Sequence, residues 1–317
     1  MLAKRNLSID ILKIALAFLI VGLHGRIFKD FSIFLAYFFQ NGISRAGVPL
    51  FLIISGYYFY SIKTKEQFAN WVKRLLYLYL IWMGIYLILW RDFSVQNILF
   101  RTIFGYYHLW YLINALYGFL FAWAVRNFKL KTQLVLIALC VIIGLSLQYI
   151  FNYGLVAYKI PFLPEPEYVN IFRNGLFFCF PFIMTGYLIN KFAWHTKKVN
   201  WLLLIAVGFS VLTCEVVFNY NHGKKLFDLL LGLYIFCPAL FVYVLNLKFY
   251  GESKTIALYS SGIYLVHILV LNILAKIVKT VSTSALSETP TTIITFLLAM
   301  LATYFLIRIQ KKFKYIL

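Results

Sequence analysis

The chain has 317 residues, of which 63% are hydrophobic and 13% are charged, and it carries a formal net charge of +20. Soluble domains are about 45–50% apolar and about 25% charged, so the composition excludes an ordinary globular protein, a disordered chain and a disulfide-stapled secreted domain. On a soluble protein the charge would suggest a nucleic-acid partner, but the loops of membrane proteins also collect Lys and Arg.

Charge-free stretches recur along the chain at about the length of a membrane-spanning helix, which needs about 20 mainly apolar residues. They cover residues 14–25, 46–62, 75–90, 102–125, 132–158, 174–190, 199–214, 229–247, 255–275 and 289–307, and the first becomes a full span if residues 7–13 are included. The sequence therefore predicts an all-α integral membrane protein with about ten transmembrane helices. We also expect a single membrane domain over residues 1–317, with no fused soluble domain.

The distribution of positive charge predicts the orientation. If the N-terminus lies inside, the loops and ends on that side hold 18 Lys and Arg residues, and the other side holds 11. Short cytoplasmic loops are enriched in these residues, so we expect both termini in the cytoplasm. Most of the excess charge is then a topology signal, and we expect membrane lipid rather than nucleic acid as the partner of the chain.

The first predicted helix carries three ionisable residues on one face, Asp10, Lys13 and His24. Eleven residues separate Lys13 from His24, which is within roughly 20° of whole turns and corresponds to a rise of about 16 Å. Ionisable groups inside a span are costly and usually functional, and histidine is the natural general base for a hydroxyl group. The alternative is an Asp10–Lys13 ion pair at the helix start, with a histidine at the membrane interface.

The next two helices carry basic residues at opposite sides of the membrane. Arg45 opens the second helix at its outer end, and Ser55 with Gly56 supplies small residues that permit close helix packing. Lys73 and Arg74 open the third helix on the inner side. They either bind phosphate groups or only follow the charge rule for cytoplasmic loops.

Three later segments carry polar groups at membrane depth. The segment 108–111, His-Leu-Trp-Tyr, lies at the start of the fourth predicted helix. It is interpreted either as an aromatic anchor in the membrane interface or as part of a functional site. Glu215, near the outer end of the seventh helix, either orients a histidine, pairs with Arg45 or stays neutral. His267 lies in the middle of a predicted helix, where a packing or hydrogen-bonding role is slightly favoured over a role in the reaction. The four cysteines have no metal-binding or redox spacing, so no metal site is predicted.

Five of these segments, in this order, resemble the membrane acyltransferase-3 family. They are residues 8–13 with His24, residues 45–57, residues 73–75, residues 108–111 and residues 261–267. The resemblance implies a ten-helix enzyme that moves an acyl group, usually acetyl, from coenzyme A to a hydroxyl group of an extracytoplasmic or lipid-linked glycan.

The resemblance also assigns roles. His24 resembles the essential histidine of the family and Arg45 its second-helix arginine, so both are expected to be catalytic, with Glu215 in the same outer third of the membrane. Lys13 stands at a position linked to donor binding, although lysine lacks the bidentate phosphate geometry of arginine. The expected acetyl-CoA residues are Asp10, Lys13, Ser55, Tyr57, Lys73 and Arg74, and the expected acceptor residues are His108, Trp110, Tyr264 and His267.

The expected function is therefore O-acyl transfer, in the first place O-acetyl transfer, to a surface glycan in a bacterial-type plasma membrane. Direct attack with His24 as general base is favoured over a covalent acyl-histidine. Two alternatives stay open. One is a transporter of a small solute or acyl group, because one branch of the family resembles membrane domains implicated in amino-acid transport. The other is a non-catalytic subunit for polysaccharide export.

Overall fold

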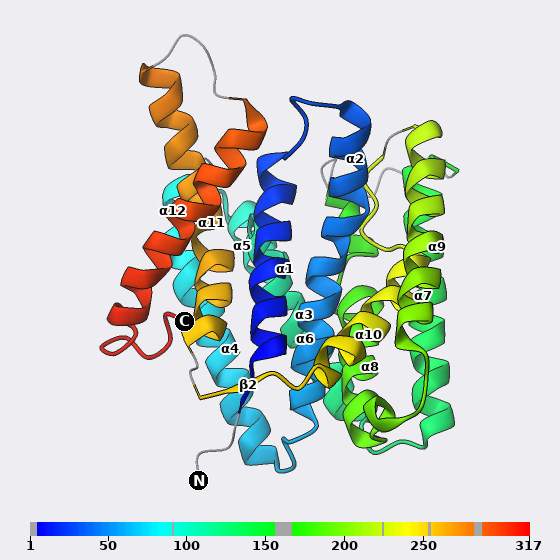
Figure 1. Cartoon of the computed structure of the whole chain (residues 1–317). Helices are drawn as coiled ribbons and strands as arrows, with labels where there is room; N and C mark the ends of the chain where they lie inside the picture. Colours follow the sequence, from blue (N-terminus) through cyan, green and yellow to red (C-terminus); the bar gives the residue numbers. More distant parts are fainter. Residues whose placement is uncertain (1–4, 91, 156–166, 224, 253–254, 282–286) are drawn as a thin grey trace. The chain divides into compact units, whose positions relative to one another are not determined.

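The computed structural model describes residues 5–90, 92–155, 167–223, 225–252, 255–281 and 287–317, which are mainly helical (Figure 1). The only strands in these ranges are β1 (Arg5–Asn6) and β2 (Tyr250–Gly251), which pair antiparallel. The helices are α1 (Leu7–Gly25), α2 (Ile33–Asn41), α3 (Gly47–Phe59), α4 (Lys65–Tyr86), α5 (Val95–Phe104), α6 (Trp110–Val125), α7 (Leu130–Asn152), α8 (Phe180–Lys191), α9 (Trp201–Asn221), α10 (Leu231–Asn246), α11 (Thr255–Val281) and α12 (Glu288–Ile309).

Seven helical segments of the described chain are long and apolar enough to cross a membrane, which confirms an all-α, multi-pass membrane protein. These segments contain α1, α4, α6, α7, α9, α11 and α12. The remaining predicted spans also contain helices, α3, α8 and α10, but these are shorter. The count of ten crossings and the cytoplasmic placement of both termini stay predictions, as does the single domain.

Several predicted helix boundaries are wrong. The third predicted helix begins at Lys65 rather than at residue 75, so Lys73 and Arg74 lie on exposed positions inside α4 and do not open it. The predicted helix 102–125 is interrupted at Gly105, which has φ +88°, and α6 begins only at Trp110. The helix α2 and all but the last three residues of α5 lie outside the predicted spans.

The long helices bury polar groups and expose apolar ones, the reverse of a soluble amphipathic helix. On α12, Thr292 and Thr303 are fully buried, while Leu297 and Leu301 are more than half exposed. On α7, Gln148 is fully buried and Ile142 is 59% exposed. Thr292 and Thr303 donate to carbonyl oxygens of α12 itself, and the Gln148 amide donates to the carbonyl oxygen of Leu229. Satisfied polar groups in the interior and apolar side chains on the outside fit a bilayer.

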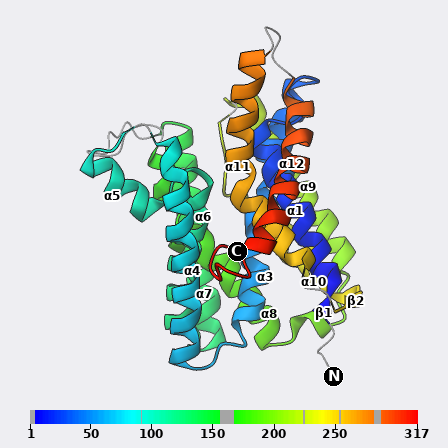
Figure 2. The ribbon, with the colours of Figure 1, turned by 90° about the vertical axis from the view of Figure 1, so that its left-hand side faces the viewer.

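Contacts divide the chain into two compact units. Unit 1 comprises 1–48, 77–91 and 243–317. In it, α1 packs against both α11 and α12, which also pack on each other (Figures 1 and 2). The β1–β2 pair joins the start of α1 to the segment that precedes α11, and the Asn6 amide donates to the carbonyl of Leu245 at 2.9 Å. Unit 1 therefore closes through parts of the chain more than 200 residues apart.

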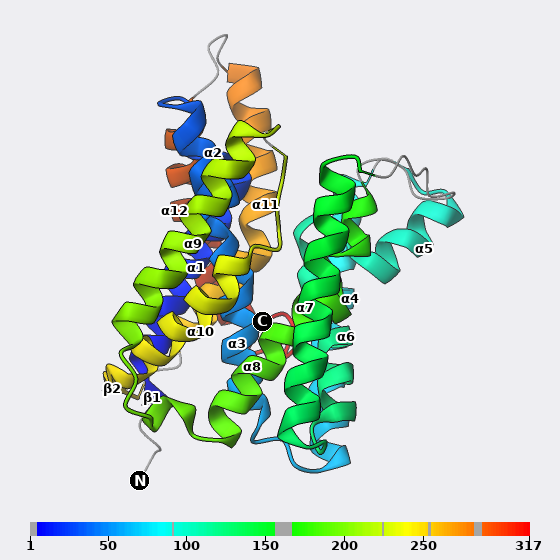
Figure 3. The ribbon, with the colours of Figure 1, turned by 90° about the vertical axis from the view of Figure 1, so that its right-hand side faces the viewer.

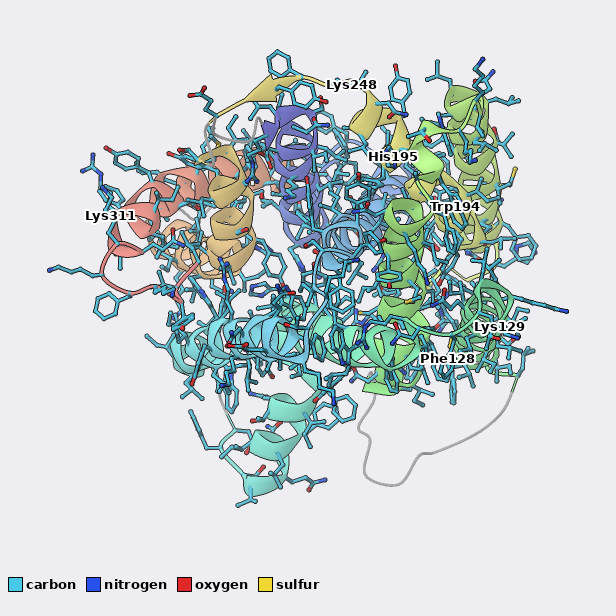
Figure 4. The ribbon with its side chains drawn as sticks, turned by 90° about the horizontal axis from the view of Figure 1, so that it is seen from below. Phe128, Lys129, Trp194, His195, Lys248 and Lys311 are labelled. Atoms are coloured by element: carbon cyan, nitrogen blue, oxygen red, sulfur yellow. The ribbon has the colours of Figure 1, made fainter. Side chains whose placement is uncertain are left out.

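Unit 2 comprises residues 49–76 and 92–242. The helices α6, α7 and α8 lie side by side in it (Figure 3). Where α3 meets α8, a Cβ atom on Gly56 would lie 2.8 Å from the carbonyl carbon of Ile183, so the two backbones touch. This contact confirms the predicted packing role of the small residues in α3. Figure 4 shows the chain with its side chains from below, and labels Lys129 in the α6–α7 connection and His195 in the α8–α9 connection.

Candidate functional site

A buried carboxylate organises two cations at the start of α1. Asp10 is 1% exposed and accepts hydrogen bonds from the guanidinium of Arg5, one of them at 2.9 Å between Nη2 and Oδ1. The Lys13 ammonium lies 3.7 Å from the same carboxylate. The Asp10–Lys13 ion pair is therefore present, with Arg5 as a partner that the sequence pattern did not suggest. One negative charge meets two positive charges, so the cluster keeps a net positive charge.

His24 lies in the last turn of α1, at the other end of the same helix. Because α1 is unbroken from Leu7 to Gly25, the helical rise places His24 about 16 Å from Lys13 along the axis. Gly25 contacts the Thr292 side chain of α12 so closely that any Cβ atom there would clash.

The structure brings His24 together with His267 of α11. Their ring centroids are 5.2 Å apart and the ring planes differ by 40°. His24 is half-buried, whereas His267 is fully buried. The Nδ1 atom of His267 lies 2.7 Å from the carbonyl oxygen of Tyr264, and the two rings of these residues are 6.2 Å apart. Two predicted acceptor residues and the predicted base thus form one cluster in unit 1.

Arg45 also belongs to unit 1. It lies in a short 3-10 turn, Ile43–Ala46, which packs against α1. Its guanidinium donates to the side-chain oxygen of Asn41 at 3.3 Å, and Asn41 is 2% exposed. The residue is half-buried and tied to α2. The structure thus supplies a second cationic side chain on an element that contacts the helix of His24.

Unit 2 holds a separate cluster around Trp110. The guanidinium of Arg173 lies over the Trp110 ring, 4.6 Å from its centroid, and forms an ion pair with Asp228 at 3.4 Å. Asp228 is 7% exposed, and its backbone N–H donates to the side chain of Gln148 at 2.8 Å. A π-helical turn, Gly175–Cys179, begins two residues after Arg173. Sequence reasoning treated Arg173 and Asp228 only as loop charges, because no local pattern links residues 55 positions apart.

The segment 108–111 faces the inside of unit 2. His108 is 2% exposed, which does not fit an aromatic anchor in the membrane interface. Tyr111 shares a side-chain hydrogen bond with Ser55 of α3, so Ser55 serves the contact between α3 and α6. Tyr57 packs its ring against Phe241 at 5.3 Å and His195 at 5.8 Å. The roles of Ser55 and Tyr57 in donor binding stay predictions.

Glu215 has a clear structural role. Its two carboxylate oxygens accept the backbone N–H groups of Leu231 and Gly232, each at 2.8 Å, at the first turn of α10. A carboxylate at a helix N-terminus satisfies free N–H groups and complements the helix dipole. Neither of the proposed partners of Glu215, a histidine or Arg45, is needed to explain it. The predicted catalytic role of Glu215 rested on a histidine or Arg45 as its partner, and the observed partners are backbone N–H groups.

Comparison with known proteins relates nearly the whole chain to one family. A family model described as an acyltransferase domain matches residues 6–308. An amino-acid racemase of Enterococcus faecalis is 25% identical over 328 residues, which cover 93% of this chain and 45% of the racemase. A serine/alanine racemase of Enterococcus gallinarum is 26% identical over 299 residues, 83% of this chain and 40% of the racemase. The chain thus spans less than half the length of these relatives. No solved structure matches it significantly.

Proposed function

The chain belongs to the acyltransferase-3 family of membrane acyltransferases, and from this premise we propose that it is an O-acyltransferase of the bacterial plasma membrane. It takes an acyl group, in the first place acetyl, from acyl-coenzyme A on the cytoplasmic side. It transfers that group to a hydroxyl group of a surface glycan or lipid-linked sugar on the other side.

The observation that carries this proposal is the arrangement of polar groups along α1. A net positive cluster, Arg5–Asp10–Lys13, lies at one end of an unbroken helix, and the half-buried His24 lies about 16 Å away at the other end. An extended pantetheine arm is on the order of 15–20 Å long. One helix therefore supplies a site for an anionic nucleotide and a base at the distance that a thioester reaches.

The Arg5–Asp10–Lys13 cluster fits the phosphate groups of such a donor. Arginine and lysine are the side chains that bind phosphate, and Asp10 neutralises only one of the two cations. The carboxylate holds both cations beside the helix start, which reduces the entropy that phosphate binding would otherwise cost. Lys73 and Arg74 belong to unit 2, where they are exposed on α4, and their part in donor binding stays a prediction.

The chemistry proposed at His24 is general base catalysis. A ring nitrogen of His24 removes the proton from the acceptor hydroxyl as its oxygen bonds to the thioester carbon. The guanidinium of Arg45 stabilises the negative charge that develops on the carbonyl oxygen. The carbon–sulfur bond then breaks, and the proton passes from the imidazolium to the leaving thiolate. The products are an O-acyl ester and free coenzyme A.

Substitution of the base tests this scheme. We expect His24→Ala to lower transfer of labelled acetyl from acetyl-CoA to cell-surface glycan by about 10²–10⁴-fold, the usual contribution of a general base. His222→Ala is the matched control, because His222 is exposed in the connection after α9. Both variants must reach the membrane in equal amount. Full activity of His24→Ala would overturn the role given to His24.

The acceptor and the acyl group can be identified together. Mass spectrometry of surface glycans from cells with and without the protein should show a mass difference of one acyl group on one sugar. Acetyl and succinyl groups differ in mass, so the same spectrum separates them. Glycans that are identical in the two cell types would contradict surface O-acylation.

The comparisons favour one second candidate. The curated relatives named above are amino-acid racemases, and the chain matches less than half of each. A membrane domain that moves an amino acid across the bilayer is therefore the alternative function. Uptake of labelled serine or alanine into vesicles without coenzyme A, lost in the same chain after heat denaturation, would support it over acyl transfer.

A further inference from the structure

The connection between α10 and α11 is fixed against the start of α1. The backbone N–H of Leu7 donates to the carbonyl oxygen of Phe249 at 2.7 Å, and the backbone N–H of Phe249 donates to the hydroxyl group of Ser8 at 3.2 Å. Lys248, which marks this connection in Figure 4, has φ +52°, a left-handed conformation that persists only where the surrounding structure enforces it. The backbone at Phe249 therefore has a defined position, although the side chain is 59% exposed.

The pairing of β1 with β2 places the side chains of Phe249 and Arg5 on one face. Arg5 pairs with Gly251, and the hydrogen bond between Leu7 and Phe249 continues the same antiparallel register. Because successive side chains of a strand alternate between its two faces, these four residues share a face. The Leu7 side chain agrees with this, since a Cβ atom on Gly251 would clash with it. Arg5 and Phe249 are diagonal neighbours, about 7–8 Å apart, which is within reach of long and aromatic side chains.

The same face leads from the Phe249 ring to the cationic cluster of α1. The Arg5 guanidinium bonds to Asp10, and the Lys13 ammonium lies 3.7 Å from that carboxylate. Phe249 pairs with Leu7, which precedes Lys13 by six residues, or about 9 Å of helical rise. The aromatic ring, the cluster and the proposed catalytic histidine therefore follow one another along α1 in that order.

An exposed aromatic ring on a membrane protein is often an anchor in the membrane interface. Such anchors are mainly tryptophan and tyrosine, whose polar atoms reach the headgroups, and phenylalanine has no polar atom. A second use of an exposed ring is to stack on a nucleobase, which any base permits because each has a π-face. The two cations beside Phe249 favour the second use, since one ribose ring separates the base of a nucleotide from its phosphate groups.

We propose that the Phe249 ring binds the adenine ring of the acyl-coenzyme A donor by stacking, while Arg5 and Lys13 bind its phosphate groups. This binding mode rests on the donor proposed above. In coenzyme A the ribose joins adenine to the phosphates, and the pantetheine arm continues from the diphosphate to the thioester. The order adenine, phosphates, thioester matches the order Phe249, cationic cluster, His24 along α1, so one extended donor molecule contacts all three.

Binding of radiolabelled coenzyme A to the purified protein in detergent tests the stacking without turnover. We expect Phe249→Ala to raise the Kd by about 5–100-fold, the effect of losing one base–aromatic stack. Phe249→Tyr keeps the ring and should bind nearly as tightly as the wild type. Phe249→Leu keeps an apolar side chain without a ring and should resemble the alanine variant. Tyr250→Ala is the matched control, because Tyr250 is 49% exposed on the opposite face of the same strand, and its Kd should not change.

A donor fragment without adenosine separates stacking from a local change of structure. 4′-Phosphopantetheine carries a phosphate group and the thiol arm but no nucleobase, so we expect the wild type and Phe249→Ala to bind it equally. Unchanged coenzyme A binding by Phe249→Ala would overturn the inference, as would an equal loss for both ligands. In either case the wild type still binds coenzyme A, so the proposed function stands. A wild type that binds no coenzyme A would refute the donor, and the proposed function with it.

Discussion

Individual residues in this chain show how one buried charge organises others. Asp10 is almost inaccessible, and both Arg5 and Lys13 depend on it for charge compensation. Removing one member of a buried charge cluster leaves the others uncompensated, which costs far more than losing a pair in water. The cluster is therefore a structural element of α1 as well as the proposed donor site.

We expect Asp10→Asn to lower the free energy of unfolding by about 3–5 kcal/mol, because two cations lose their counter-charge while the side-chain shape is kept. Thermal unfolding in detergent micelles measures the effect. Glu288→Gln is the matched control, since its ion pair with Lys29 is 36% and 48% exposed at the two side chains. The control should change stability by less than about 1 kcal/mol. Equal shifts for both variants would contradict the buried-cluster description.

At this scale the sequence predicted the positions of residues along a helix better than it predicted their partners. The helical spacing of Asp10, Lys13 and His24 was enough to place them along one helix. The ring contact between His24 and His267 spans 243 positions, and no periodic pattern encodes it. The partners of Glu215 are backbone N–H groups of α10, which have no sequence signature at all.

Among the helices, hydropathy located the membrane-spanning parts and misplaced several ends. A charge-free window measures the part of a helix that lies in hydrocarbon, whereas α4 continues through Lys73 and Arg74 because lysine and arginine are good helix formers. The nine residues of α2 are too few to cross a bilayer, so a search for spans passed over them. Ser94 caps the first turn of α5 by accepting the N–H of Asn97, a signal that such a search does not use.

The contact between α3 and α8 gives a prediction for helix packing. A methyl group on Gly56 would meet the backbone of Ile183, which cannot move aside as a side chain can. We expect Gly56→Ala to lower stability by about 1–3 kcal/mol, the usual cost of overpacking. Gly84→Ala is the matched control, because nothing lies within 4 Å of a Cβ atom there. The control should be neutral or slightly stabilising. Thermal unfolding of both variants compares them, and an unaffected Gly56→Ala would refute the backbone contact.

At the scale of the whole molecule, the uneven distribution of Lys and Arg predicts which connections lie on the cytoplasmic side of the membrane. We expect single cysteines at Lys129 and Lys197, in a background without the four native cysteines, to react with an impermeant maleimide only after the cells are permeabilised. Both positions belong to connections with the predicted inner charge excess. A cysteine at Asp92, between α4 and α5, should react in intact cells. Labelling of Lys129→Cys and Asp92→Cys from the same side would contradict the predicted orientation.

The discontinuity of unit 1 has a consequence for biosynthesis. α1 leaves the ribosome before α11, its packing partner, which begins only at Thr255, roughly 230 residues after α1 ends. At a synthesis rate of about 5–20 residues per second, α1 waits on the order of ten seconds or longer for that partner. During this interval the face of α1 that packs against α11 and α12, and that carries Asp10 and Lys13, is not yet covered by these helices. Insertion of the nascent chain therefore requires either retention of α1 beside the insertion machinery or a temporary partner that shields these charges from lipid.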